Sequence, residues 1–174
     1  MDVITGAMPS SIGGEAALAL YIFGLTLAAI SDFHSLRIPN WLTGALAAAF
    51  LPAALFFGHR VDWLSHLGAG VGVFLGAAVF FALGVMGGGD VKLLAATALW
   101  MGAARLLPFL MLTAAVGGVF AILVLALRHP VVQAGCLAVL RRLPSFAEKN
   151  RPIPYGIPIA VAGILMAPSL AFLV

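Results

Sequence analysis

Long apolar segments separated by short polar loops make up most of this 174-residue sequence. The pattern predicts apolar helices over about 16–30, 41–57, 63–85, 91–100, 106–127 and 158–172. Asn40 is expected to cap the second helix. The stretch from Val91 to Leu127 is too long for one span and is expected to divide at Gly102, Arg105 and Pro108. We therefore expect an all-α membrane bundle of about six transmembrane helices, with residues 1–174 forming a single integral membrane domain.

The composition is that of a membrane protein, because 63% of the residues are hydrophobic, 9% are charged and the mean hydropathy is +1.16. A soluble domain is nearer to about half apolar and about a quarter charged. The single cysteine, Cys136, excludes an intrachain disulfide and a cysteine-cluster metal site. The histidines show no metal-ligand spacing, so we expect no metal and no cofactor and interpret them as polar loop or interface residues: His34, His59, His66 and His129.

The net charge of +3 comes from basic residues in the loops, and we interpret it as a signal of membrane topology and not of nucleic-acid binding. When alternate loops are assigned to opposite sides, one side holds Arg60 and Arg105. The other holds Arg37, Lys92, Arg128, Arg141, Arg142, Lys149 and Arg151. By the positive-inside rule the second side is cytoplasmic and both termini lie outside. Residues 128–152 then form a cytoplasmic basic loop, in which 131–140 is apolar enough for an amphipathic surface helix.

Two acids stand at the ends of apolar segments, where a charge is costly and by default indicates a functional site. Asp32 follows the first apolar segment and Asp90 precedes the fourth, so both are expected at the cytoplasmic face. The three glycines before Asp90 would let another backbone approach within hydrogen-bonding distance. In the third helix, glycines recur every four residues on one face and are expected to let a neighbouring helix pack closely, which would help the two acids to meet: Gly68, Gly72 and Gly76.

Two carboxylates held close together do not both ionise cheaply, so one keeps a proton near neutral pH. The ionised acid can then take a proton from water while the protonated acid polarises a peptide carbonyl, as peptide hydrolysis requires. Structural roles are the alternatives: Asp32 could pair with Arg37, and Asp90 could cap the fourth helix by accepting bonds from the amides of Lys92 and Leu93. The Lys92 side chain is expected to extend toward the cytoplasm rather than to serve as a base.

Three segments resemble those of a known family. Gly87 to Asp90, followed by Val91-Lys92-Leu93-Leu94, is similar to the glycine-x-glycine-aspartate motif of the type IV prepilin peptidases, a family of membrane aspartic proteases. Asp32 followed by Arg37-Ile38-Pro39-Asn40 resembles the first aspartate motif of that family, and Ile153-Pro154-Tyr155-Gly156 resembles its segment before the last span. The segments occur in the expected order, and the resemblance covers about residues 15–170.

The resemblance implies an aspartic endopeptidase of the bacterial inner membrane that removes the positively charged leader of prepilins or pseudopilins at the cytoplasmic face. The hydrophobic N-terminal helix of the substrate would lie in the lipid bilayer. Asp32 and Asp90 would be the catalytic pair. The motifs add candidate substrate-binding or motif-supporting residues: Gly87, Gly88, Gly89, Lys92, Arg37, Pro39, Asn40, Pro154, Tyr155 and Gly156.

The sequence lacks the early cytoplasmic domain with paired cysteines that larger family members carry. That domain is associated there with N-methylation of the new pilin terminus, so we expect no methyltransferase activity. The compact form is similar to the peptidases of tight-adherence, Flp-type pilus systems. The residues alone leave two other interpretations: a small proton-coupled transporter or channel that uses the same aspartates, and a non-catalytic assembly factor.

Overall fold

The computed structural model describes residues 12–56, 61–134, 145–148 and 151–170, and within them it contains helices and no strand. The α-helices are α1 (Ile12–Ser35), α2 (Asn40–Phe56), α3 (Trp63–Ala82), α4 (Gly88–Leu127) and α6 (Gly156–Met166), and the 3₁₀ helices are η2 (Ser145–Ala147) and η3 (Ala167–Ser169). Residues 130–134 are also helical. The predicted all-α fold is confirmed. The amphipathic helix expected over 131–140 lies mostly outside the described residues.

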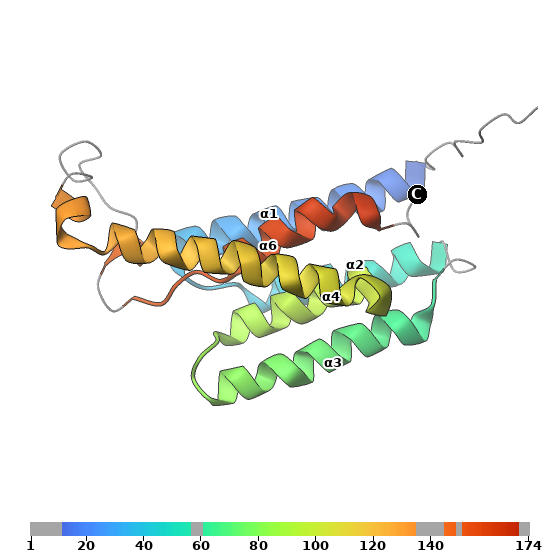
Figure 1. Cartoon of the computed structure of the whole chain (residues 1–174). Helices are drawn as coiled ribbons and strands as arrows, with labels where there is room; N and C mark the ends of the chain where they lie inside the picture. The colour runs from blue at the N-terminus through green and yellow to red at the C-terminus, as the bar shows by residue number, and fades with distance from the viewer. Residues whose placement is uncertain (1–11, 57–60, 135–144, 149–150, 171–174) are drawn as a thin grey trace, which may run out of the picture.

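The helices form an up-and-down bundle (Figure 1). α4 turns back on itself near its middle, so its two halves run in opposite directions beside α3 and α6. α1 begins at the end of the bundle where α6 ends, as expected for an even number of passes. Which side of a membrane that end faces stays a prediction.

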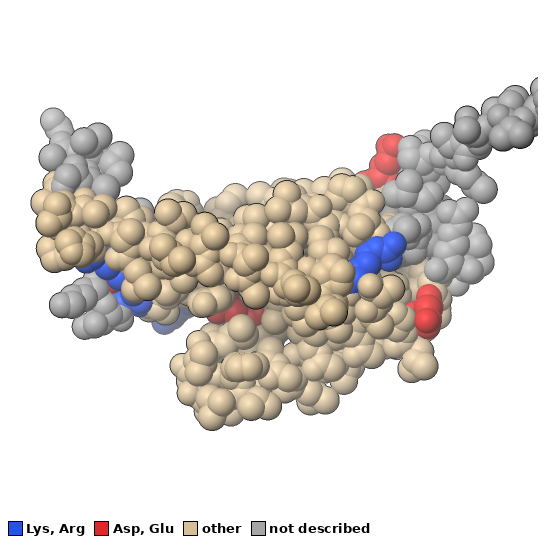
Figure 2. Space-filling model, viewed as in Figure 1, with Lys and Arg blue, Asp and Glu red and all other residues tan. Residues whose placement is uncertain are grey.

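Three helical stretches are long and apolar enough to cross a membrane: Gly13–Ser35, Trp63–Ala82 and Gly88–Leu127, the last measured through its turn. Figure 2 shows how sparse charge is on one face of the bundle, where lysine, arginine, aspartate and glutamate side chains show mainly toward the two ends, apart from one recessed acidic patch. A surface of this kind suits lipid contact.

The turn inside α4 is centred on Gly102, whose φ of 67° and ψ of 171° are not helical. A continuous helix would pair the carbonyl of Leu99 with the N–H of Ala103. Here both groups bond to α3 instead, because Nδ1 of His66 lies 2.8 Å from the Leu99 oxygen and the Ala103 N–H donates to Oγ of Ser65 at 2.9 Å. Two adjacent side chains of α3 therefore satisfy the backbone groups that the turn releases.

These contacts correct two expectations. Of the residues predicted to divide the long apolar stretch, Gly102 does so, whereas Arg105 and Pro108 lie within the second half of α4. A proline near a helix start removes one backbone bond without ending the helix. His66 is not an interface residue as expected, since it is 7% exposed and its ring stacks on Phe50.

We expect Gly102→Ala to lower the free energy of unfolding by about 1–3 kcal/mol, because an L side chain at this φ is strained. An added Cβ would also lie 3.1 Å from Cε1 and Nε2 of His66. Thermal unfolding of the detergent-solubilised protein measures the effect. Gly118→Ala is the control, since an added Cβ there meets nothing within 4 Å. Equal midpoints for the two variants would contradict the account of the turn.

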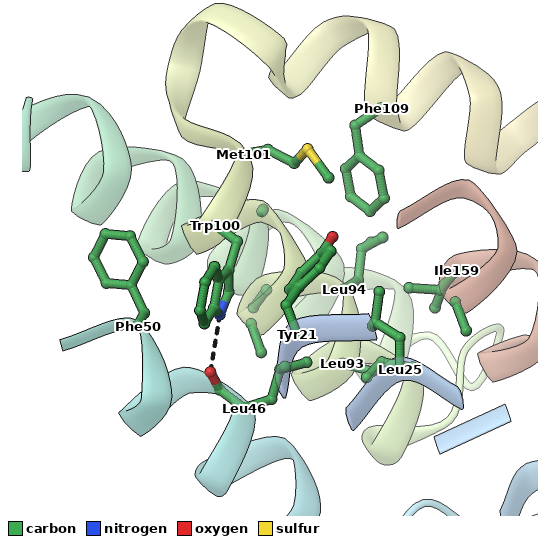
Figure 3. Packing of buried hydrophobic residues seen from close by; sticks show 14 of the residues in the cluster. Tyr21, Leu25, Leu46, Phe50, Leu93, Leu94, Trp100, Met101, Phe109 and Ile159 are labelled. Carbon is green, nitrogen blue, oxygen red and sulfur yellow. Dashed lines mark hydrogen bonds between the residues drawn. The ribbon is translucent and has the colours of Figure 1, made fainter. Parts of the chain in front are cut away.

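Trp100, in the first half of α4, lies at the centre of the buried core (Figure 3). Its ring centroid is 5.1 Å from that of Tyr21 in α1 and 5.7 Å from that of Phe50 in α2. The indole N–H donates to the carbonyl of Leu46 at 2.9 Å, so the buried polar atom is satisfied. One side chain thus joins three helices.

Trp100→Ala is expected to destabilise the protein by about 3–5 kcal/mol, because the removed ring leaves a cavity that its neighbours fill only in part. Trp41→Ala is the matched control, since Trp41 is 68% exposed and no such cavity forms. Unfolding midpoints of the two variants in the same detergent provide the comparison. A similar loss at both positions would mean that Trp100 does not organise the core.

The glycine strip of α3 does not pack as predicted. Gly68, Gly72 and Gly76 are exposed, and an added Cβ at each meets nothing within 4 Å. The opposite face packs on α4, where an added Cβ at Gly70 would lie 3.2 Å from Cβ of Leu99. The prediction was wrong because both faces of a membrane helix are apolar, so the spacing of small residues does not tell which face is inside.

Candidate active site

Asp32 lies in the last turn of α1, which extends beyond the predicted end of the first span and reaches Ser35. Serine hydroxyls cover backbone carbonyls at this helix end: Ser31 Oγ donates to the Arg37 carbonyl at 2.8 Å, and Ser35 Oγ to that of Ser31 at 2.7 Å. The Asp32 side chain points into the bundle and is only 4% exposed. Its Oδ2 accepts a hydrogen bond of 2.8 Å from the N–H of Gly156, the first residue of α6.

Asp90 is the third residue of α4, and Gly87 is the N-cap of that helix. The alternative that Asp90 is itself the cap is therefore wrong. Its half-buried carboxylate faces the N–H of Gly87, and it also faces the N–H of Gly156. A Cβ added at Gly87 would lie 2.9 Å from Oδ2 of Asp90, so the carboxylate lies against the start of its own helix.

The two aspartates line one cavity of about 660 Å³. They come from α1 and α4, and the start of α6 lies between them because the Gly156 N–H faces both carboxylates. The two carboxyl groups are close enough for their charges to interact. The remaining walls of the cavity are residues 36–38, 84–89 and 152–155. Arg37 is the one basic side chain in this described lining, and it forms no ion pair with Asp32, so that predicted structural alternative is not observed.

The glycines before Asp90 are places of close approach. A Cβ added at Gly87 would lie 2.9 Å from Oδ2 of Asp90, and one added at Gly89 would lie 3.1 Å from Cβ of Ile38. Distances of this size leave almost no room for a side chain. The glycine run therefore keeps Asp90 in its position and lets the loop before α2 pack on the start of α4.

Gly156 is even more tightly enclosed. A Cβ added there would lie 2.8 Å from Oδ2 of Asp32 and 2.7 Å from Cδ1 of Ile38. Ile38 is thus packed between the first turns of α4 and α6, and it is 7% exposed. The resemblance placed Ile38 in the first aspartate motif. A single apolar residue between Arg37 and Pro39 nevertheless gave no chemical reason to predict a role for it at the site.

Two further motif residues, Asn40 and Lys92, connect the starts of α2 and α4. Lys92 Nζ donates to Oδ1 of Asn40 at 2.8 Å, and its side chain is exposed. That this side chain extends toward the cytoplasm stays a prediction. Asn40 is the first residue of α2 and not its cap as expected. The carbonyl of Pro39 accepts from the N–H groups of Leu42 and Thr43 at 3.1 and 3.4 Å, so the residue before Asn40 occupies the capping position.

The segment before α6 closes one side of the cavity. Pro154 is buried in the cavity wall, and Tyr155 is the N-cap of α6. Arg128, at the end of α4, links this segment to η2. Its guanidinium donates to the carbonyl of Phe146 in η2 at 2.7 and 3.1 Å and to the carbonyl of Arg151 at 2.7 Å. The sequence had indicated only a topological role for Arg128. Nothing in its spacing could predict which carbonyls it would bind.

Gly88 begins α4 beside the ring of Phe81 in α3, which an added Cβ would approach to 3.3 Å. Each glycine of the run therefore lies close to a different neighbour, namely Asp90, Phe81 or Ile38. Within the described residues, no group of three or more histidine, cysteine, aspartate or glutamate side chains gathers in the way that a metal site requires.

A model of the type IV leader peptidase family matches residues 19–122, more than half of the sequence. The chain belongs to the type IV leader peptidase family. No curated protein and no solved structure matches it. The matched region includes both aspartates and the glycine run but ends before α6. The contact between Gly156 and Asp32 thus adds the start of α6 to the site as a third segment. The family model does not cover this segment.

Membership of the leader peptidase family makes the protein a membrane peptidase with a prepilin-like substrate in general terms. Its cavity agrees with that class, since two carboxyl groups and the loop residues 84–89 line one space. The match to a peptidase family favours the peptidase over the transporter and the assembly factor, and these two interpretations stay as alternatives that a cleavage experiment tests.

Proposed function

We propose that this protein is an aspartic endopeptidase that removes the leader peptide of prepilins or pseudopilins at the cytoplasmic face of the bacterial inner membrane. Asp32 and Asp90 are its catalytic pair. The observation that carries the proposal is that both carboxyl groups line one cavity and face the same backbone N–H, that of Gly156. Pairing of two acids in a partly buried site is the arrangement that activated-water peptide hydrolysis needs.

In the proposed reaction the two carboxyl groups share one proton. This proton belongs to the pair and is not assigned to one of the two residues. The ionised carboxylate removes a proton from a water molecule, whose oxygen attacks the scissile carbonyl carbon. The protonated carboxyl group donates to the carbonyl oxygen, and the resulting diol is a neutral tetrahedral intermediate. Collapse re-forms a carbonyl and breaks the C–N bond: one hydroxyl of the diol gives its proton to the ionised carboxylate, and the leaving nitrogen takes the proton of the other carboxyl group. Water is consumed and the pair returns to its starting state.

The walls of the cavity suit an extended peptide. The loop over residues 84–87 is mostly exposed and lines the cavity, and Gly87 places no side chain beside the Asp90 carboxylate. The segment 152–155 lines the same cavity. A substrate strand held between these two segments would bring its scissile carbonyl to the carboxyl pair. Such alignment of reacting groups accounts for a large part of enzymatic rate enhancement.

The distribution of basic residues supports a cytoplasmic active site. Arg37 lines the cavity, Lys92 lies in the second turn of α4, and Arg128 and Arg151 are joined beside the segment that enters α6. Arg105 follows the Gly102 turn of α4 by three residues, and Figure 1 shows that this turn lies at the end of the bundle opposite the start of α4. Short loops rich in lysine and arginine remain on the cytoplasmic side.

Co-expression tests the proposal. The protein is produced together with an epitope-tagged prepilin in a host that lacks pilus genes, and the size and N-terminal sequence of the pilin are determined. We expect conversion to the mature form only when the peptidase is present. A precursor that stays uncut beside membrane-inserted protein would contradict the proposal, and proton flux in liposomes without cleavage would favour a transporter instead.

A further inference from the structure

A second cavity, of about 530 Å³, lies on the other side of the start of α4. Asp90 lines the first cavity and Lys92 lines the second, because side chains two residues apart on a helix point to opposite sides. Its walls are α2 and α3, and the first half of α4 forms its floor. Its polar lining residues are Asn40, Thr43 and Lys92, and Gly44 lines the α2 wall.

The two cavities share no lining residue. Between them, Ile38 packs on Gly89, where an added Cβ would come within 3.1 Å, and Lys92 is bonded to Asn40 at 2.8 Å. A peptide in the aspartate cavity therefore does not continue into the second one without breaking these contacts. The second cavity is a separate site and not an extension of the first.

The chemistry of the second cavity is divided along its length. Polar groups gather at one end, at Asn40, Thr43 and Lys92, and the rest of the lining is hydrocarbon or glycine. No acid lines it. The Lys92 ammonium carries three donors, of which Asn40 Oδ1 takes one, so the same group can bind an anion at this end. The apolar part lies between α2, which is a shorter apolar helix, and α3 and α4, which are long and apolar enough to cross a membrane.

We propose that this cavity binds one anionic phospholipid, whose acyl chain lies along the apolar part and whose phosphate binds Lys92. A lipid is the ligand that combines a long hydrocarbon chain with a negative group at the membrane surface. Because Lys92 is two residues from Asp90 and also holds Asn40, a phosphate there steadies the start of α4, where the first cavity has its glycine run.

Native mass spectrometry of the purified protein tests the site. The detergent-solubilised chain is incubated with equal amounts of phosphatidylglycerol and phosphatidylcholine of the same chain length. We expect one phosphatidylglycerol bound with about fivefold preference, as one lysine near an anionic headgroup provides. Lys92→Gln should reduce the preference to about one, and Lys92→Arg should keep it. The measurement does not use cleavage, so it stands or fails independently of the proposed peptidase activity.

Two glycine variants separate this cavity from general lipid contact. Gly44→Leu fills the cavity from α2 and should abolish retention of both lipids, whereas Gly76→Leu on the outer face of α3 should not. An added Cβ meets nothing within 4 Å at either position, so both variants should fold. Equal retention of the two lipids by wild type, or a preference unchanged in Lys92→Gln, overturns the proposal. So does a Gly44→Leu protein that loses prepilin binding but keeps phosphatidylglycerol, because the cavity would then belong to the substrate.

Discussion

Asp32→Asn and Asp90→Asn are each expected to lower the rate of prepilin cleavage by about 10³-fold while leaving the protein folded. The amide keeps the volume of the carboxyl group, and the Gly156 N–H can still donate to an oxygen at position 32. What is lost is the group that accepts or donates the proton. Purified variants assayed on one prepilin, with cleavage followed by mass spectrometry, give the rates.

Asp62→Asn is the matched control for these variants. Asp62 caps α3, where its Oδ1 accepts from the N–H of Ser65 at 3.1 Å, and it does not line the aspartate cavity. Asparagine is an equally good cap, so both stability and rate should be unchanged. A fully active Asp32→Asn or Asp90→Asn variant would mean that the pair does not perform the chemistry, even though the enzyme is a peptidase.

Gly156→Ala is expected to reduce the cleavage rate by about 10²-fold through displacement of Asp32. The added methyl would lie 2.8 Å from Oδ2 of Asp32, closer than a carbon and an oxygen can approach without a shift. The carboxylate or the first turn of α6 must therefore move. Since substrate binding uses other walls of the cavity, kcat should fall while KM changes little.

Gly163→Ala controls for crowding of α6 away from the site. An added Cβ there would lie 2.7 Å from Cδ1 of Leu25 and 2.9 Å from the Tyr21 hydroxyl, so it should lower the unfolding midpoint. Its kcat per folded molecule should remain close to that of wild type. If Gly163→Ala and Gly156→Ala lose rate in proportion to stability alone, Gly156 has no special role beside Asp32.

The sequence was sufficient to predict the class of fold, because the lengths of the apolar segments limit the possible spans. It was also sufficient to predict the turn at Gly102, because a glycine followed by Arg105 and Pro108 interrupts an apolar stretch that is too long for one span. It was insufficient for the packing of α3. The Gly68, Gly72 and Gly76 strip faces outward, and the face that carries Gly70 meets α4. In a soluble helix polarity separates the two faces, but here both faces are apolar.

At the site, the distribution of charge predicted that the two aspartates lie at the same face of the membrane. The structure places both in one cavity, and which side that cavity faces stays a prediction. The sequence did not indicate that the start of α6 lies between them. Gly156 acts through a backbone N–H, which every residue except proline carries, so no side-chain pattern marks it. The sequence also did not show that Gly87, and not Asp90, is the N-cap of α4. Both glycine and aspartate are favourable N-cap residues, and packing decides at which of two nearby positions the helix begins.

The most direct test of the carboxyl pair is a double-mutant comparison under single-turnover conditions. Wild type, Asp32→Asn, Asp90→Asn and the variant with both substitutions are assayed on one prepilin in lipid nanodiscs. If the two residues act as one unit, the double variant is about as slow as either single variant, roughly 10³-fold below wild type. Losses that multiply, or a single variant that retains the wild-type rate, would contradict a shared role for Asp32 and Asp90.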